Sequence, residues 1–241
     1  MYPMQSKTPA YDKVPTMFSP DGRLYQVEYA SKIVSQGTMG VACKYNNGIL
    51  FGTYKKVNSK LLIPESVEKI FPVDDHIVAV SAGLVGDARR LIGIARQKAQ
   101  DNRMYYSEKI SVESLTKEVS NVKQVFTQYA GMRPFGIALI IGGIDTTGKR
   151  LFETEPSGAL AEYHAIAIGK NRDKAMSIFE TMWKATLSKE AAIKMLIKAI
   201  QIGITEKEVF DVNKLQFVFI DSETKKYDSI SSEELSGFIS K

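Results

Sequence analysis

One stretch of sequence decides the fold of this chain, Phe135-Gly136-Ile137-Ala138-Leu139-Ile140-Ile141. It contains no charged or polar side chain, so both faces of a strand built from it would be apolar. A sheet with one face in water alternates between apolar and polar residues, and this stretch does not alternate. The stretch therefore predicts a central strand in a sheet that is covered above and below.

β-Hairpins are expected on both sides of this strand. Their arms are 39–44 with 49–54, 69–73 with 76–82, and 215–221 with 225–228, and single strands are expected at 149–153 and 162–168. The first hairpin turns at Asn47-Gly48, a pair that tolerates the positive φ of a tight turn, and the second turns at Asp74-Asp75. Strands in such blocks favour an α+β fold over alternating βαβ units.

Helices separate the strand blocks. Apolar residues recur at helical spacing in 88–99, 112–126 and 189–203, and a short helix is expected at 232–238. Ser111 and Ser188 are the expected N-caps of two of them. With a strand covered on both faces, the simplest packing is a four-layer αββα sandwich, in which two stacked sheets lie between two helix layers. No repeat or linker divides the chain, so we expect one domain over 1–241, including an N-terminal arm and helix at 1–37.

The composition excludes several classes of protein. Lys and Arg total 32 against 27 Asp and Glu, a net charge of +5, but the densest basic runs hold only two such residues, so no nucleic-acid partner is expected. The longest charge-free apolar runs have ten residues, about half of what spans a bilayer, so no membrane partner is expected either. Cys43 is the only cysteine and the first 18 residues lack the apolar core of a signal peptide, which predicts a cytoplasmic location.

Side chains that could carry catalysis are few. His76 and His164 are 88 positions apart, and neither has a second ligand at metal spacing. The sequence motifs of α/β-hydrolases, nucleotide-binding loops and zinc peptidases are missing. Cys43 lies inside an apolar strand, where a buried and inert thiol is expected. The residues themselves therefore imply no active site, no cofactor and no metal.

The N-terminal segment at 11–30 is the most informative part of the chain. Ser19-Pro20-Asp21-Gly22 predicts a turn, and Leu24, Val27 and Val34 then form an apolar stripe up to Gly37, which predicts a helix over 24–35. Four aromatic residues lie within nineteen positions of this segment, which suits an interface better than a free surface.

This segment resembles the N-terminal signature of proteasome α-subunits, the outer-ring subunits of the proteasome core particle. The resemblance continues through 58–61, 81–89, 127–136 and 155–158, covers nearly the whole chain and is closest to the archaeal type. It implies the αββα sandwich of N-terminal-nucleophile hydrolases, in agreement with the layers expected above. It also implies a non-catalytic role in ATP-dependent protein degradation, in which a ring of seven α-subunits stacks on proteolytic β-subunits and its arms close the axial pore to unfolded protein substrates.

The resemblance assigns two groups of residues. The gate cluster, which fixes a reverse turn that holds the gate open, is Tyr11, Asp12, Pro20 and Tyr29. The activator-tail pocket, which receives the C-terminal carboxylate of a regulatory ATPase or another activator between adjacent α-subunits, is Lys60, Gly83, Leu84 and Glu28. A carboxylate and phenols can exchange hydrogen bonds between arms, and a lysine can hold a partly desolvated carboxylate.

The resemblance also leaves questions open. Ser31 stands where many archaeal relatives carry Arg, so the preferred activator is not fixed. The composition of the ring and the order of residues 1–10 are not fixed either. The helices at 24–35 and 112–128 are the candidates for contacts between ring subunits.

Two other functions stay open. The first is an active threonine protease, because Gly37-Thr38-Met39-Gly40 is similar to the N-terminal start of a proteolytic β-type chain. The preceding helix opposes it, as do Tyr54 where the β-type has an acid and Glu65 near its activating lysine. The second is a monomeric small-molecule binder with the same fold.

Overall fold

The computed structural model describes residues 14, 16–56, 59, 61–204 and 210–239. Ten strands form two five-stranded sheets in this part of the chain, and every strand pairing is antiparallel. The first sheet has the order β10 (Tyr227–Ile230), β9 (Leu215–Asp221), β2 (Gly48–Tyr54), β1 (Gly40–Tyr45) and β8 (Ala165–Ile168). The second has the order β3 (Ile70–Asp74), β4 (Ile77–Gly83), β5 (Ile137–Asp145), β6 (Gly148–Thr154) and β7 (Leu160–Glu162). The three predicted hairpins are confirmed.

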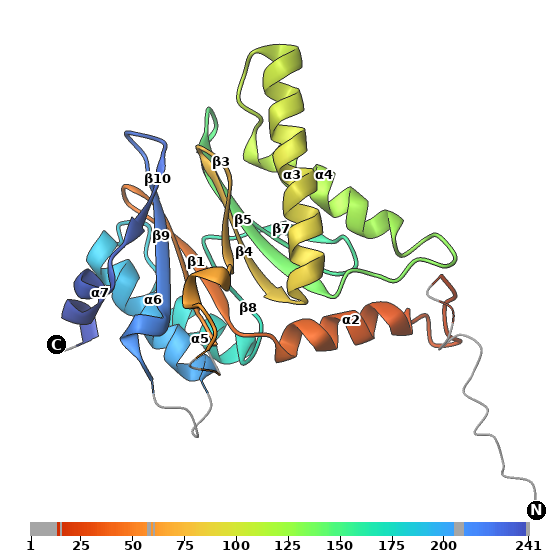
Figure 1. Ribbon diagram of the computed structural model, residues 1–241, viewed down its shortest axis with the longest axis horizontal. Coiled ribbons are helices and arrows are strands. Elements are labelled where there is room, and N and C mark those ends of the chain that lie inside the picture. Colours follow the sequence, from red (N-terminus) through yellow and green to blue (C-terminus); the bar gives the residue numbers. More distant parts are fainter. Residues whose placement is uncertain (1–13, 15, 57–58, 60, 205–209, 240–241) are drawn as a thin grey trace, which may run out of the picture.

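Helices cover the outer faces of both sheets (Figure 1). The helices are α2 (Tyr25–Gln36), α3 (Val85–Tyr106), α4 (Val112–Val125), α5 (Arg172–Met182), α6 (Lys189–Gly203) and α7 (Ser232–Ile239), with short 3₁₀ turns η1 (Pro64–Ser66) and η2 (Val212–Lys214). Ser111 and Ser188 cap α4 and α6 as predicted, each by accepting a hydrogen bond from the backbone N–H three residues later. None of the described helices is long and apolar enough to cross a membrane.

The core lies in three layers, as the αββα sandwich requires. The middle layer joins the two sheets and includes Phe51, Ile140 and Ile220. One outer layer joins the second sheet to α3 and α4, and the other joins the first sheet to α5 and α6. Every residue of β5 from Ile137 to Ile144 is buried, so the prediction of a strand covered on both faces is confirmed.

One predicted strand is wrong in its continuity. The expected strand at 162–168 is two strands in different sheets, since β7 pairs with β6 and β8 pairs with β1. The chain changes sheet at Tyr163-His164, and the His164 ring stacks on Trp183 with the ring centroids 4.4 Å apart. Local alternation of apolar residues reports which face is covered but not which sheet a strand joins, which is why the sequence missed this break.

The N-terminal helix α2 lies across the ends of β4 and β5 rather than in one of the helix layers (Figure 1). It begins and ends within one residue of the predicted range. Only Ala30 and Val34 of its twelve residues are buried. Most of the surface of α2 is therefore available for contacts outside the described chain.

Candidate functional site

The segment before α2 forms the predicted turn. The backbone N–H of Gly22 donates to the carbonyl oxygen of Ser19 at 2.9 Å, and the N–H of Ser19 donates to the carbonyl oxygen of Arg23 at 2.9 Å. The Ser19 hydroxyl is buried with its residue and accepts from the N–H of Arg23 at 3.0 Å. Gly22 has a φ of +75°, which a side chain would strain. The turn is thus closed by three hydrogen bonds.

An ion pair ties this turn to the first turn of α2. Arg23 donates from Nε to Glu28 Oε1 at 2.6 Å and from Nη2 to the other carboxylate oxygen. The guanidinium lies 5.1 Å from the centroid of the Tyr25 ring, which stacks on Tyr29. The hydrogen bond from Arg23 lowers the pKa of Glu28. Because both side chains are well exposed, we assign the pair an orienting role rather than a stabilising one.

The predicted gate cluster is only partly within the described residues. Pro20 lies on the exposed side of the turn, and Tyr29 lies on α2 with its side chain half exposed. Tyr11 and Asp12 lie outside the described residues, as does Lys60 of the predicted activator-tail pocket. The structure therefore describes the turn and the helix of this segment but not the arm residues of the predicted cluster.

Three glycines bring the end of α2, the end of β4 and the start of β5 together. A Cβ atom at Gly83 would lie 2.2 Å from the carbonyl oxygen of Gly136, and one at Gly37 would lie 2.7 Å from the backbone nitrogen of Gly83. Gly83 has a φ of +124°, so this position favours glycine twice over. Leu84 follows, is partly exposed and donates its N–H to the Gly136 carbonyl oxygen at 2.9 Å. We call Gly83 and Leu84, with Gly37 and Gly136 behind them, the glycine corner.

The glycine corner has features that suit an incoming carboxylate. Helix α3 begins at Val85, so the positive end of its dipole lies beside the corner. Leu84 precedes the helix without a side-chain cap, which leaves the first helical N–H groups to other acceptors. Glu28 lies apart from the corner within one chain, since it is nine positions before Gly37 along the helix, a rise of about 13 Å.

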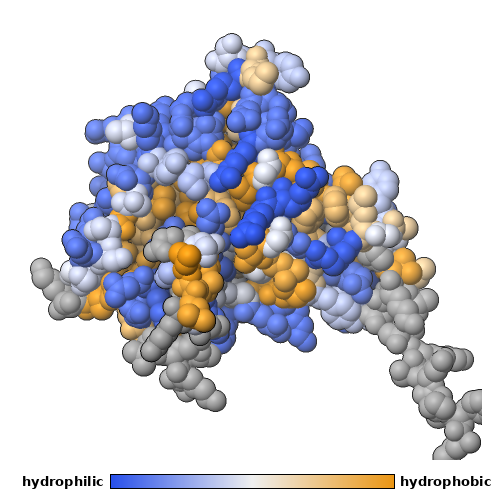
Figure 2. Space-filling model, in the orientation of Figure 1, coloured by the Kyte–Doolittle hydropathy of each residue, from blue (hydrophilic) through white to orange (hydrophobic). Residues whose placement is uncertain are grey.

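Apolar side chains are exposed around this end of the molecule. Leu61 is 94% exposed and Ile63 is 66% exposed in the loop before η1. Ile33 on α2 and Val85 at the start of α3 are also exposed. Figure 2 shows apolar side chains gathered on the lower part of this face, among hydrophilic ones. Exposed apolar residues in such number are typical of a surface that is covered in an assembly.

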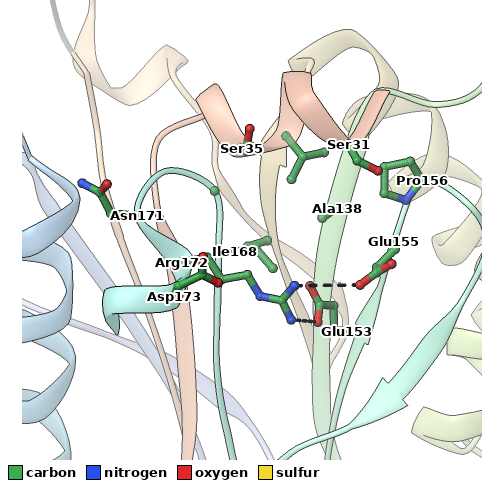
Figure 3. Close-up of a pocket in the computed structure, with 12 residues that line it drawn as sticks. Ser31, Ser35, Ala138, Glu153, Glu155, Pro156, Ile168, Asn171, Arg172 and Asp173 are labelled. Carbon is green, nitrogen blue, oxygen red and sulfur yellow. Dashed lines mark hydrogen bonds and ion pairs between the residues drawn. The ribbon is translucent and has the colours of Figure 1, made fainter. Parts of the chain in front are cut away.

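A pocket of about 380 Å³ lies between α2 and the ends of β6 and α5 (Figure 3). On its floor Arg172 donates to the buried carboxylate of Glu153 at 2.6 Å and lies 3.8 Å from Glu155. Burial raises the pKa of Glu153 to about 7, against the opposing effect of Arg172. Ser31 and Ser35 line the opposite wall from α2, so the helix contributes no charge to the pocket at these positions.

The geometry around Thr38 does not resemble an activated nucleophile. Its hydroxyl is buried without a hydrogen-bond partner among the described residues, and its nitrogen is a peptide nitrogen joined to Gly37. The Tyr54 hydroxyl accepts from the N–H of Asp211 at 3.3 Å, and the side chain of Glu65 lies outside what the structure describes. A general base or a free amine is what such a hydroxyl would need.

Other candidates for chemistry are buried or isolated. Cys43 is fully buried, as predicted, and burial raises the pKa of its thiol. The His76 ring is buried, and its Nε2 lies 2.9 Å from the carbonyl oxygen of Ile110. No group of three His, Cys, Asp or Glu side chains within the described ranges could hold a metal ion.

Two charged contacts of this region were not predicted. Arg23 and Glu28 are five residues apart across the start of a helix, outside the usual spacing of helical ion pairs. Arg133 and Asp87 form a two-pronged ion pair although 46 positions separate them. Only a three-dimensional arrangement could have indicated the second pair, because nothing in the local sequence links the two residues.

Known proteins are similar to this chain over most of its length. A family model for proteasome subunits matches residues 34–220, and a model for the N-terminal signature of A-type proteasome subunits matches residues 11–32. The proteasome α-subunit of Methanosphaerula palustris is 46% identical over 229 residues, which cover 95% of this chain and 94% of the relative. That of Methanothermobacter thermautotrophicus is 45% identical over 235 residues, which cover 98% of this chain and 93% of the relative. That of Methanopyrus kandleri is 45% identical over 220 residues, which cover 91% of this chain and 89% of the relative.

Proposed function

The chain belongs to the proteasome subunit family as an α-type, non-catalytic subunit of the core particle, and from this premise we propose that its N-terminal arm gates the axial pore of an α-ring. The proposal includes a ring of seven subunits stacked on β-subunits in the cytoplasm. The observation that carries it is the closed turn at Ser19–Arg23, which Arg23 and Glu28 hold against α2. A fixed turn gives the arm a defined direction of exit from the helix.

We further propose that the glycine corner and Lys60 receive the C-terminal tail of an activator. The corner offers close backbone approach, the positive end of α3 and the exposed side chain of Leu84. These groups suit a chain end that carries both an apolar side chain and a carboxylate. Lys60 would supply the cation, which is worth about 1.5 to 3 kcal/mol for a charged hydrogen bond.

The ring itself is supported by the exposed apolar residues of α2 and of the loop before η1. Leu61, Ile63 and Ile33 are exposed in the described chain, and a head-to-tail neighbour in a ring would cover them. Native mass spectrometry of the purified chain tests this part, since a heptamer or a larger species supports a ring. A stable monomer of 26.8 kDa would instead favour a free-standing binder.

The gate is tested in particles assembled with archaeal-type β-subunits, by the hydrolysis of a short fluorogenic peptide. We expect deletion of residues 1–10 to raise the basal rate several-fold, because the pore then lacks its cover. We expect Lys60→Ala to abolish stimulation by a synthetic activator-tail peptide, whereas Lys226→Ala in the distant β9–β10 turn should be stimulated like wild type. Equal stimulation of the Lys60→Ala and wild-type particles would remove the lysine from the tail pocket.

A further inference from the structure

The loop that follows α4 contacts the glycine corner through Gly136. Its carbonyl oxygen accepts from the N–H of Leu84 at 2.9 Å, and its N–H donates to Asp87 Oδ2 at 2.8 Å. Asp87 lies in the first turn of α3, directly after the corner. Both backbone polar groups of Gly136 are therefore bound by the start of α3, so Gly136 itself follows any movement of that start.

Arg133 binds the carboxylate of Asp87 through both terminal nitrogens of its guanidinium. Nη2 lies 2.7 Å from Oδ1 and Nη1 lies 2.9 Å from Oδ2 of Asp87, and Nη1 also donates to the carbonyl oxygen of Pro134. A planar guanidinium paired in this way fixes direction as well as distance. Asp87 thus joins the corner to a second point of the loop, three residues before Gly136.

The other side of this loop faces the N-terminal segment. A hollow of about 430 Å³ is lined by Val14 of the arm, Gln26 of α2 and the loop residues from Ala130 to Pro134. Figure 1 shows the loop after α4 turning toward the start of α2. Close-packed interfaces resist displacement, but a loop beside a hollow can shift without breaking packed contacts. The width of this hollow is set by where the loop is held.

We propose that Arg133 is a positioning residue that couples the glycine corner to the gating arm. A ligand that shifts Leu84 or the first turn of α3 moves Asp87, and Asp87 moves Arg133 and the loop. The loop then changes the space in which Val14 and Gln26 lie. The inference rests on the proposed gating function and adds the route by which the tail pocket and the gate are linked.

The coupling role can be separated from a role in binding. Without the Arg133 side chain, Asp87 still accepts from the N–H of Gly136, so the corner keeps its shape. A particle with Arg133→Ala should therefore bind an activator tail normally, but tail binding should no longer stimulate peptide hydrolysis as it does in wild type. A residue that only supported the fold would lower tail binding, assembly and stimulation together.

The experiment measures two quantities on assembled particles. One is the dissociation constant of a fluorescent activator-tail peptide, and the other is the ratio of tail-stimulated to basal hydrolysis of a short peptide. For Arg133→Ala we expect a dissociation constant within about twofold of wild type and a stimulation ratio at least about threefold lower. Arg133→Lys should restore part of the ratio, because a lysine keeps the charge but cannot bind both oxygens.

Arg103→Ala is the matched control, because Arg103 pairs with Asp74 at the far end of the same helix at 2.6 Å. It should keep the wild-type ratio. Asp87→Asn serves as a second variant if Arg133→Ala does not assemble, since an amide keeps the acceptor for Gly136 and weakens the pair with Arg133.

Three results would overturn the inference. The first is a wild-type stimulation ratio in the Arg133→Ala particle, and the second is a loss of stimulation that a weaker tail affinity accounts for fully. Both leave the proposed gate intact. The third is a wild-type particle that the tail does not stimulate, which removes the proposed tail docking and the inference together.

Discussion

Two phenylalanines show how the interior of the molecule differs from its α2 edge. Phe51 lies between the two sheets and is fully buried, where it packs with Ile140 and Leu151, whereas Phe18 lies just before the turn and is 66% exposed. The sandwich interior is held together by apolar burial. The α2 edge buries only Ala30 and Val34 of the helix, and the turn before it is closed by hydrogen bonds and tied to α2 by the ion pair between Arg23 and Glu28. The comparison teaches that stability resides in the sandwich, while the edge carries groups that would be completed by a partner.

The contrast between the interior and the α2 edge is tested most directly by replacing Phe51 and Phe18 with alanine, one at a time. We expect Phe51→Ala to lower the free energy of unfolding by about 3 to 5 kcal/mol, because it leaves a cavity between the sheets. Phe18→Ala should change it by less than about 0.5 kcal/mol in the isolated chain. Urea denaturation of the unassembled subunits measures both. A large loss in Phe18→Ala would mean that the edge contributes to the fold by itself.

The sequence could predict features that depend on neighbouring residues, but not those that depend on contacts between distant parts of the chain. The run that becomes β5, the three hairpins and the capping serines Ser111 and Ser188 follow from local patterns, because each pattern reports burial or turn geometry within a few residues. The assignment of β7 and β8 to different sheets does not follow from a local pattern, since it depends on distant strands. For the candidate site, the turn at Ser19–Gly22 was predicted, but the contacts that fix it and the Arg133–Asp87 pair arise only after folding.

The interior is not purely apolar, because it also holds a fully buried lysine. Lys123 on α4 is fully buried, and its amine donates to the carbonyl oxygens of Thr154 at 2.8 Å and Ile137 at 3.1 Å. Burial lowers the pKa of Lys123 to about 7, and the nearby carboxylate of Glu153 opposes that shift. Its acceptors belong to two strands of the second sheet, so no pattern within the helix could have predicted its burial.

Lys123 gives the second prediction, which concerns pH. The folded chain loses this proton near pH 7, whereas the unfolded chain keeps it up to the ordinary lysine pKa of 10.5. Above pH 7 the unfolded state therefore binds more protons, and the free energy of unfolding should rise by about 2 kcal/mol between pH 7 and 9. Below pH 7 the amine is charged in both states and the full cost of burying the charge applies.

The measurement is urea denaturation of wild type and Lys123→Met at several pH values from 7 to 9. The variant should lack the rise that this lysine supplies to wild type. Lys117→Met is the matched control on the same helix, because Lys117 is exposed and pairs with Glu113 at 2.7 Å. Parallel curves for wild type and Lys123→Met would show that the buried amine does not titrate in this range.

The smallest effect on stability is expected at the edge, from the ion pair between Arg23 and Glu28. Arg23→Ala should leave the thermal midpoint within about 2 °C, because exposed ion pairs contribute little. It should instead speed the hydrogen exchange of the Ser19, Gly22 and Arg23 amides several-fold, since these amides lie in the turn that the pair holds against α2. High salt should produce the same change in wild type.

Two further variants, Arg23→Lys and Lys98→Ala, test whether faster hydrogen exchange in the turn results from loss of the pair between Arg23 and Glu28. Arg23→Lys should fall between wild type and Arg23→Ala, because one ammonium cannot bind both oxygens of Glu28 as the guanidinium does. Lys98→Ala, which breaks a similarly exposed pair with Glu118, should leave the turn amides as slow as in wild type. If Arg23→Ala also left them slow, the turn would be held by its own backbone bonds. The direction of the arm would then be set by residues before Ser19 and not by its attachment to α2.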